Sequence, residues 1–377
     1  MPHTDLPFRL QSLLDEGVSQ RLFTGAQVAY TIDTPAITAL HSGTTDTDRR
    51  RPITGDTFFD IASLTKLFTA TAALRAADDG LLPLHTPIAQ MPLPPRWQRF
   101  GARNATVAHL LRHTSGLPAW HPYFADVPPS QRGTPQGHQH ILQAVLDTPC
   151  HRAVGAQTEY SDLGFIALAA LLSDALGKPF ADIIAQFVLA PLQLSQVHFR
   201  PLDAPPRFDV RYATTGICPW HHRPLTGAVH DDNARAMGGV AGHAGLFARA
   251  ADIAKLGYAW LGALERDALL RADTAQAAIE RGRGERGLGV DLKSPTGSSA
   301  GDSASLHAFG HLGFTGCSLW VDPARRALLV LLANRTRTGA PSRAMSAFRR
   351  RCYELFFSSI APGGSAGGFS RTNSSSN

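Results

Sequence analysis

The chain has 377 residues, of which 44% are hydrophobic and 18% charged, so it can bury the core of a large globular protein. The net charge of +6 comes from arginine, because only four of the 36 basic residues are lysine. The arginine triplets Arg49–Arg51 and Arg349–Arg351 have no interleaved aromatic residues and no helix-turn-helix pattern beside them. We therefore interpret both triplets as solvated surface and expect no nucleic-acid partner.

The four cysteines are scattered and form no Cys-x-x-Cys pair, which argues against a zinc site and against a disulfide framework. The N-terminus lacks the basic segment and apolar core of a signal peptide, and no run of apolar residues reaches transmembrane length. We expect a cytoplasmic protein without a membrane span, or a periplasmic one if an export signal has been trimmed. The sequence leaves the oligomeric state open.

The hydrophobic pattern changes from strands to helices and back to strands along the chain. A helix is predicted over residues 5–20, followed by strands over 26–31 and 36–40. Helices are predicted in the middle of the chain over 67–77, 107–113, 138–147, 163–176, 180–189, 250–264 and 274–281. Strands return over 305–311, 318–323 and 327–332, before a helix over 342–358. The Gly- and Ser-rich tail, 361–377, is predicted to be disordered.

Strands at both ends and helices between them predict an α/β (α+β) fold. We expect one domain over residues 1–360, in which 1–60 and 285–360 form an antiparallel sheet with flanking helices. Residues 61–284 are expected to form an inserted all-helical lobe. A cleft between two such lobes is a usual place for a binding or catalytic site.

Ser63 and Lys66 stand at the start of the apolar helix predicted over 67–77. A spacing of three residues places both side chains on one side of a helix. A serine at a helix start is favoured as an alkoxide, and a desolvated lysine loses pKa and can serve as a base. Lys66 is also the only lysine with a serine three residues before it. The pair predicts an activated serine nucleophile, although such a short pattern also occurs by chance.

Two other stretches carry residues that suit acyl transfer. Tyr160 precedes the helix predicted over 163–176, and a tyrosine near an ammonium can become phenolate and move a proton. A ring that only packs against the helical lobe is the alternative. His311 has Gly310 and Gly313 beside it, and glycine in a strand lets a ligand approach the backbone. A backbone N–H at this strand end would suit an oxyanion hole.

Taken together and in this order along the chain, the stretches around Ser63, Tyr160 and His311 resemble the serine β-lactamase and penicillin-binding-protein superfamily, particularly its class C-related serine hydrolases. The family's Ser-x-x-Lys matches Ser63 and Lys66, its Tyr-x-Asn matches Tyr160–Asp162, and its Lys-Thr-Gly, often His-x-Gly outside the β-lactamases, matches His311–Gly313. Residues 110–117 and 238–247 are also family-like, and the resemblance covers residues 20–357.

The resemblance implies a set of site residues and no cofactor. It implies catalytic roles for Ser63, Lys66, Tyr160 and His311, and a substrate site lined by Asp162, Gly313, Phe314 and His243. It also implies that the backbone N–H groups of Ser63 and Phe314 hold the oxyanion.

Two positions depart from the family pattern. Asp162 replaces the usual asparagine and, as a carboxylate, can only accept hydrogen bonds. His311 replaces the lysine of β-lactamases and so weakens the permanent positive charge of the site. Both changes argue against an efficient β-lactamase.

Residues 229–234 and the glycine-rich stretch around His243 resemble a subgroup that includes penicillin-binding-protein-like hydrolases and muropeptide amidases. His230, Asp231, Asp232 and His243 are candidate metal ligands by residue type, but their spacing matches no standard site, so we expect no metal. We expect His243 to line the substrate site. For His230 and Asp231, a structural turn is at least as good an interpretation.

The sequence therefore predicts a serine hydrolase that cleaves an amide or ester through an acyl-enzyme on Ser63. Lys66 and Tyr160 would move the proton, and His311 would tune Tyr160 or bind a substrate carboxylate. We favour an amide in cell-wall-derived muropeptides as the substrate. A promiscuous carboxylesterase, a D-amino-acid peptidase, a catalytically silent muropeptide-binding protein and a metal-dependent hydrolase are the alternatives.

Overall fold

The computed structural model describes residues 5–48, 51–203, 210–282, 284 and 286–361, so Arg49, Arg50 and nearly all of the predicted disordered tail lie outside the described residues. The main sheet is antiparallel, with strand order β2-β1-β9-β8-β7-β6. Its strands are β1 (Gly25–Ile32), β2 (Thr38–Gly43), β6 (Asp291–Leu292), β7 (Phe309–Leu312), β8 (Ser318–Asp322) and β9 (Ala327–Ala333). The first two strands and the last four come from opposite ends of the chain, which confirms the predicted sheet.

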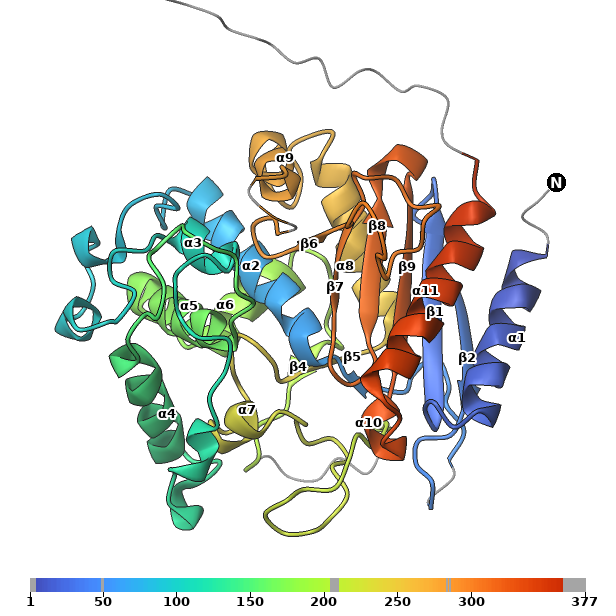
Figure 1. Cartoon of the computed structure of the whole chain (residues 1–377), viewed down its shortest axis with the longest axis horizontal. Coiled ribbons are helices and arrows are strands. Elements are labelled where there is room, and N and C mark those ends of the chain that lie inside the picture. Colours follow the sequence, from blue (N-terminus) through green and yellow to red (C-terminus); the bar gives the residue numbers. More distant parts are fainter. Residues whose placement is uncertain (1–4, 49–50, 204–209, 283, 285, 362–377) are drawn as a thin grey trace, which may run out of the picture.

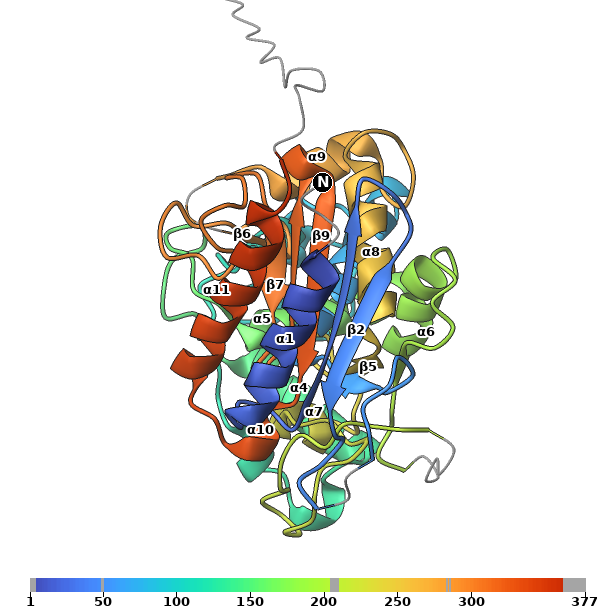
Figure 2. The same ribbon diagram turned by 90° about the vertical axis from the view of Figure 1, so that its right-hand side faces the viewer.

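The two ends of the chain meet at the β1–β9 pair, where Val28 lies opposite Leu331. Every residue of β9 is buried because helices cover both faces of the sheet. Helices α1 (Leu6–Ser19) and α11 (Ser342–Ser358) lie on one face, and α8 (Ala250–Ala263) lies on the other (Figures 1 and 2). Successive strand residues point to opposite faces, so Leu329 packs with α1 and α11 whereas Leu328 packs with the α8 side.

The middle of the chain is mostly helical and lies beside the sheet (Figure 1). Its remaining α-helices are α2 (Thr65–Asp78), α3 (Val107–Leu111), α4 (Pro135–Asp147), α5 (Asp162–Leu176), α6 (Phe180–Ile184), α7 (Asp232–Ala236) and α9 (Ala272–Ile279), and α10 (Arg335–Thr338) follows β9. A π-helical turn, Ala185–Leu189, continues α6. Short 3-10 turns occupy Ala62–Leu64, Ile88–Gln90, Pro95–Gln98, Tyr123–Ala125, Pro129–Gln131 and Pro323–Arg325.

The middle segment is not entirely helical. A second, small sheet has the order β3-β5-β4, formed by β3 (Phe59–Asp60), β4 (His198–Phe199) and β5 (Leu246–Ala248). The residues before α2 pair with β5, and this pairing fixes where α2 begins. Helix α8, which also belongs to the middle of the chain, covers the main sheet instead of joining the other helices.

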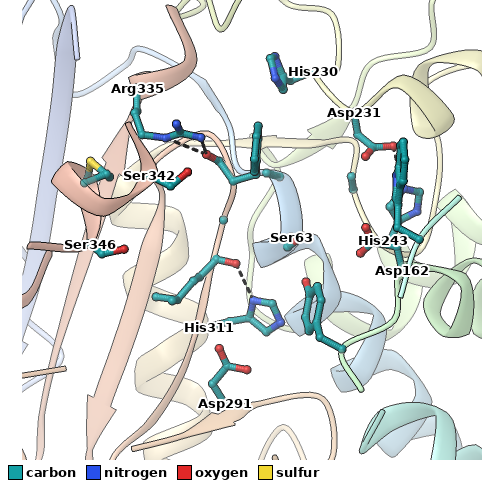
Figure 3. A pocket seen from close by; sticks show the side chains of 18 of the residues that line it. Ser63, Asp162, His230, Asp231, His243, Asp291, His311, Arg335, Ser342 and Ser346 are labelled. Carbon is teal, nitrogen blue, oxygen red and sulfur yellow. Dashed lines mark hydrogen bonds and ion pairs between the residues drawn. The ribbon is translucent and has the colours of Figure 1, made fainter. Parts of the chain in front are cut away.

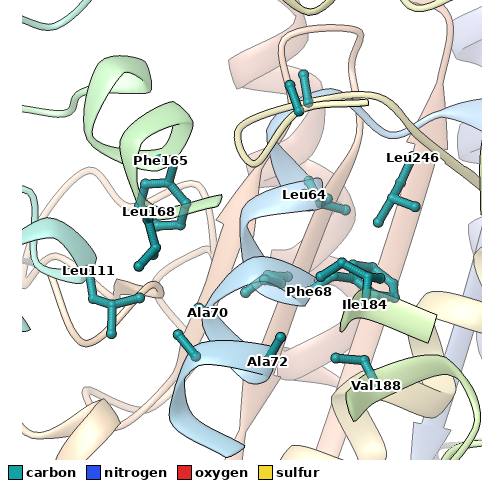
Figure 4. Close-up of a cluster of buried hydrophobic side chains, with 14 of the residues drawn as sticks. Leu64, Phe68, Ala70, Ala72, Leu111, Phe165, Leu168, Ile184, Val188 and Leu246 are labelled. Atoms are coloured by element: carbon teal, nitrogen blue, oxygen red, sulfur yellow. The ribbon is translucent and has the colours of Figure 1, made fainter. Parts of the chain in front are cut away.

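Helix α2 is the central element of the larger core (Figure 4). Its side chains are buried on nearly every side, as the all-round apolar pattern predicts. Leu111 and Phe165 approach α2 from one side, and Ile184 and Leu246 from the other. Because α2 is wedged between the helices and the sheet, a side chain at its N-terminus has a fixed position relative to both.

Two predicted strands differ from the observed ones at their starts. The strand predicted over 305–311 begins only at Phe309, because Ser305 makes a turn whose N–H and hydroxyl both donate to the carboxylate of Asp322. The strand predicted over 36–40 is displaced to Thr38–Gly43. Among the described residues, no single helix is both long and apolar enough to cross a membrane; α5 and the helix after it would pass only as a pair bent by 84°.

Candidate active site

Ser63 lies in the 3-10 turn that joins β3 to α2. Ala62 has a φ of 47°, an uncommon conformation for a residue with a side chain, so the turn must be held by its surroundings. Asp60 holds it: its buried carboxyl group accepts hydrogen bonds from the backbone N–H of Ala62 at 2.8 Å and of His230 at 2.6 Å. Burial raises the pKa of Asp60 to about 6. The carboxyl group thereby ties the Ser63 turn to the His230 segment.

Lys66 lies directly beneath Ser63 and is fully buried. Its Nζ contacts three acceptors: Ser63 Oγ at 3.0 Å, Asp162 Oδ1 at 2.7 Å and the carbonyl oxygen of His243 at 3.2 Å. Burial by itself lowers the pKa of Lys66, but the Asp162 carboxylate and Tyr160 outweigh burial, so the net pKa is raised. The predicted loss of lysine pKa is therefore wrong, because Asp162 keeps Lys66 as an ammonium.

Tyr160 lies over this ammonium, with Lys66 Nζ 4.8 Å from the centre of its ring. The guanidinium of Arg286 lies 4.8 Å from the same centre, and the His113 ring packs at 4.6 Å. The backbone N–H of Ser161 donates to His113 Nδ1 at 2.9 Å, and the Ser161 hydroxyl caps α5. The tyrosine is thus held in place by its loop, with two cations beside its ring.

The end of β7 brings His311 and Gly313 to the other side of Ser63. A Cβ at Gly313 would lie 2.7 Å from the carbonyl oxygen of Ile61, so only glycine lets the strand approach the Ser63 turn this closely. His311 is buried, and its Nδ1 donates to the Leu312 carbonyl at 2.9 Å. Burial holds the pKa of His311 well below 6.5, and the Lys66 and Arg286 cations lower it further. With its Nδ1–H used on Leu312 and its ring neutral, His311 presents only an acceptor at Nε2, which does not favour the predicted contact with a substrate carboxylate. Tuning of Tyr160 stays a prediction.

The 230–243 region packs against the Lys66 side of the site. His243 is buried, and its Nε2 donates to Asp231 Oδ1 at 2.9 Å. Asp231 also caps α7, and although burial raises its pKa, His243 and the cap outweigh burial and hold that pKa below its ordinary value. Asp232 pairs with Arg235, and the ring of His230 stacks on Phe314 at 5.8 Å. Among the described residues, no group of three or more His, Cys, Asp or Glu side chains is arranged to hold a metal ion.

Most of these side chains line one cavity of about 590 Å³ (Figure 3). Seven predicted site residues line it, namely Ser63, Tyr160, Asp162, His243, His311, Gly313 and Phe314, and Lys66 lies beneath them. The volume is typical of a small-ligand site.

The walls of this cavity differ in charge. Arg286, Arg335 and Arg349 line it from the sheet side together with Asp291, which pairs with Arg286, whereas Asp162, Asp231 and Asp232 line it from the helical side. Arg335 and Arg349 donate to backbone carbonyls and keep the sheet side cationic, whereas Lys66 and Arg235 offset two of the three carboxylates on the helical side. This difference in charge can orient a charged substrate.

The sequence did not identify the three arginines as site residues. Arg349 belongs to a triplet predicted to be solvated, yet it is buried and its Nη2 donates to the carbonyls of Gly313 at 2.6 Å and Cys317 at 2.9 Å. For Arg349 the prediction is wrong, because α11 presents this residue to the end of β7, whereas Arg351 of the same triplet is exposed. Arg286 follows a glycine-rich loop and pairs with Asp291, and nothing in its local sequence indicates that it reaches Tyr160.

Comparison with known proteins gives a family match over nearly the whole chain. A family model described as "Beta-lactamase" matches residues 10–351. An N-acetylmuramyl-L-alanine amidase of Bacillus subtilis (strain 168) is 29% identical over 75% of this chain and 69% of its own length. A putative D-alanyl-D-alanine carboxypeptidase of Escherichia coli (strain K12) is 28% identical over 75% of this chain and 70% of its own. The solved structure of EstCE1, a hydrolase with promiscuous acyltransferase activity, superimposes with a TM-score of 0.73 at 20% identity, covering 93% of this chain and 98% of EstCE1.

Proposed function

The chain belongs to the beta-lactamase family and is a serine hydrolase, and from this premise we propose that it cleaves an amide bond of muropeptides through an acyl-enzyme on Ser63. The bond we assign is the amide between the lactyl group of muramic acid and its peptide. The observation that carries the proposal is the Ser63–Lys66–Asp162 contact in the wall of a cavity whose far side is lined by arginines.

In the proposed reaction, Ser63 Oγ attacks the carbonyl carbon and the backbone N–H groups of Ser63 and Phe314 stabilise the oxyanion. Lys66 donates to Ser63 Oγ at 3.0 Å, and its positive charge favours the developing alkoxide. Tyr160 is the proposed base that takes the serine proton and then delivers it to the leaving amine, and its ring centre lies 4.8 Å from both Lys66 Nζ and the Arg286 guanidinium. Water then attacks the acyl-enzyme and regenerates Ser63.

The charged residues of the cavity support a leaving group that is a peptide carrying carboxylates. Arginine is the preferred partner of a carboxylate, and Arg286, Arg335 and Arg349 all lie on one side of Ser63. The neutral His311 and the Lys66-bound carboxylate of Asp162 stand where β-lactamases carry a lysine and an asparagine, and neither suits the recognition of a β-lactam. The B. subtilis relative is named for the same amide bond.

The test compares three substrate classes with purified protein. N-acetylmuramyl-L-Ala-D-Glu should be hydrolysed to N-acetylmuramic acid and dipeptide, faster than nitrocefin and faster than D-Ala-D-Ala peptides. Efficient turnover of short-chain p-nitrophenyl esters with intact muropeptides would replace the amidase by the esterase alternative. A fluorophosphonate should label Ser63 in the wild type but not in Ser63→Ala, and no labelling would indicate a catalytically silent binding protein.

A further inference from the structure

Trp120 is an exposed aromatic side chain in the wall of the Ser63 cavity. Its side chain is 47% exposed, whereas large apolar side chains of this chain are mostly buried. Among the described residues, no aromatic ring packs on its indole, and no acceptor forms a hydrogen bond with its Nε1–H. A large apolar surface left open beside a nucleophile indicates a ligand that covers it.

The backbone around Trp120 is nevertheless fixed to the catalytic loop. The carbonyl of Ala119 accepts from the N–H of Asp162 at 2.8 Å, and the carbonyl of Pro118 accepts from the Ser161 hydroxyl at 2.6 Å. The N–H of Ala119 donates to the carboxylate of Glu159 at 3.2 Å. The backbone that carries the indole is therefore fixed next to Asp162, in the loop that also carries Tyr160 to the cavity.

The polar groups on the helical side of the cavity are hydrogen-bond acceptors. The side chains of Asp231 and Asp232 are 24% and 31% exposed, and each carboxylate already has a nitrogen partner, His243 or Arg235. Their remaining lone pairs can accept hydrogen bonds from hydroxyl or amide groups. A substrate ammonium would gain less beside Asp232, because the Arg235 guanidinium already offsets the charge of that carboxylate. A flat apolar face beside hydroxyl acceptors is the surface that a pyranose ring complements.

We propose that Trp120 is the stacking platform for a sugar ring on the acyl side of the scissile bond, with Asp231 and Asp232 accepting hydrogen bonds from its hydroxyl or acetamido groups. The proposal rests on the proposed function in that the acyl group is taken to be muramyl. It adds a specificity-determining subsite and orients the substrate: the sugar lies on the Trp120 side, and the carboxylated peptide lies toward Arg335 and Arg349.

The experiment uses two substrates that share one scissile amide, N-acetylmuramyl-L-Ala-D-Glu and D-lactoyl-L-Ala-D-Glu, which lacks the sugar. The readout is the ratio of their kcat/KM values. Trp120→Ala should lower this ratio at least ~10-fold, mainly by raising KM for the sugar substrate, since an aromatic contact of this kind contributes about a factor of ten. Trp120→Phe should restore most of the ratio. Phe8→Ala is the matched control, because Phe8 is 73% exposed on α1 and outside the cavity.

The outcomes separate this inference from the function on which it rests. Equal wild-type kcat/KM for both substrates, or an unchanged ratio in Trp120→Ala, overturns the sugar subsite and leaves the amidase intact. If the wild type cleaves neither substrate, the amidase is wrong, and calorimetric titration of N-acetylmuramic acid into the Ser63→Ala protein decides about the subsite. Binding that is lost in Ser63→Ala/Trp120→Ala supports it, and absence of binding overturns it.

Discussion

Replacing Asp162 by asparagine tests whether the fold holds Lys66 as an ammonium. Nζ and Oδ1 are 2.7 Å apart, the Lys66 side chain is fully buried, and 18% of the Asp162 side chain is exposed. At this separation the attraction is roughly 6 kcal/mol with an effective dielectric constant of about 20. Asparagine keeps an acceptor oxygen but removes the charge. Breaking one partner of a buried pair costs about 3–5 kcal/mol, and we expect a loss of unfolding free energy in this range at pH 7.

The pH dependence gives the sign of the effect. In the wild type the folded-state pKa of Lys66 is raised above its ordinary value of 10.5, so the stability from the pair is fully present below pH 10.5 and is lost only as pH rises through the folded-state pKa. In Asp162→Asn, burial without the carboxylate places the pKa of Lys66 below its ordinary value. The unfolded chain then binds the extra proton, and the unfolding free energy rises with pH by up to about 1.4 kcal/mol per unit.

Urea denaturation at pH 7, 8 and 9 measures both quantities. Asp302→Asn is the matched control, because Asp302 pairs with Arg350 at 2.5 Å and 68% of its side chain is exposed. The control should lose about 1 kcal/mol or less and show no added pH slope, since a guanidinium does not deprotonate in this range. A loss below about 1 kcal/mol in Asp162→Asn, with the wild-type pH dependence, would show that Lys66 is neutral in the folded protein.

Ser63→Ala should lower kcat/KM at least ~10³-fold without changing Tm, as judged by ester hydrolysis and calorimetry; a phosphonate adduct mapped elsewhere by mass spectrometry would contradict the assignment. Tyr160→Phe should lower kcat at least ~10²-fold, and retention of more than about half of the activity would exclude the proton path given above. The pKa of His311 lies well below 6.5, so its imidazole NMR signals should not titrate between pH 6 and 8, and a titration there would refute the neutral assignment. Asp60→Asn should lower the free energy of unfolding by about 1–3 kcal/mol in urea denaturation, because the new amide NH₂ would face one of the two backbone N–H groups that now donate to the carboxyl group. An unchanged stability would show that these hydrogen bonds do not hold the Ser63 turn.

Local sequence patterns predicted most helices and strands, because hydrophobic residues in this fold recur with the spacing of a helix or a strand. The all-round apolar run of α2 indicated a helix inside the core, and the continuous apolar run of β9 indicated a strand covered on both faces. The start of β7 was predicted too early because the Ser305–Asp322 hydrogen bonds join residues 17 positions apart. Such a contact leaves no periodic signal in the sequence.

The sequence by itself determined that Ser63 and Lys66 lie together, because they are three residues apart at one helix start and this spacing fixes their contact. It also determined that Tyr160 and His311 belong with them, through motif order. The tertiary structure alone decided the electrostatics. Lys66 meets Asp162 across 96 positions, and that contact reverses the effect of burial on the lysine pKa. Only folding brings Arg349 and Trp120 to the walls of one cavity, because charge and exposure depend on neighbours that are distant along the chain.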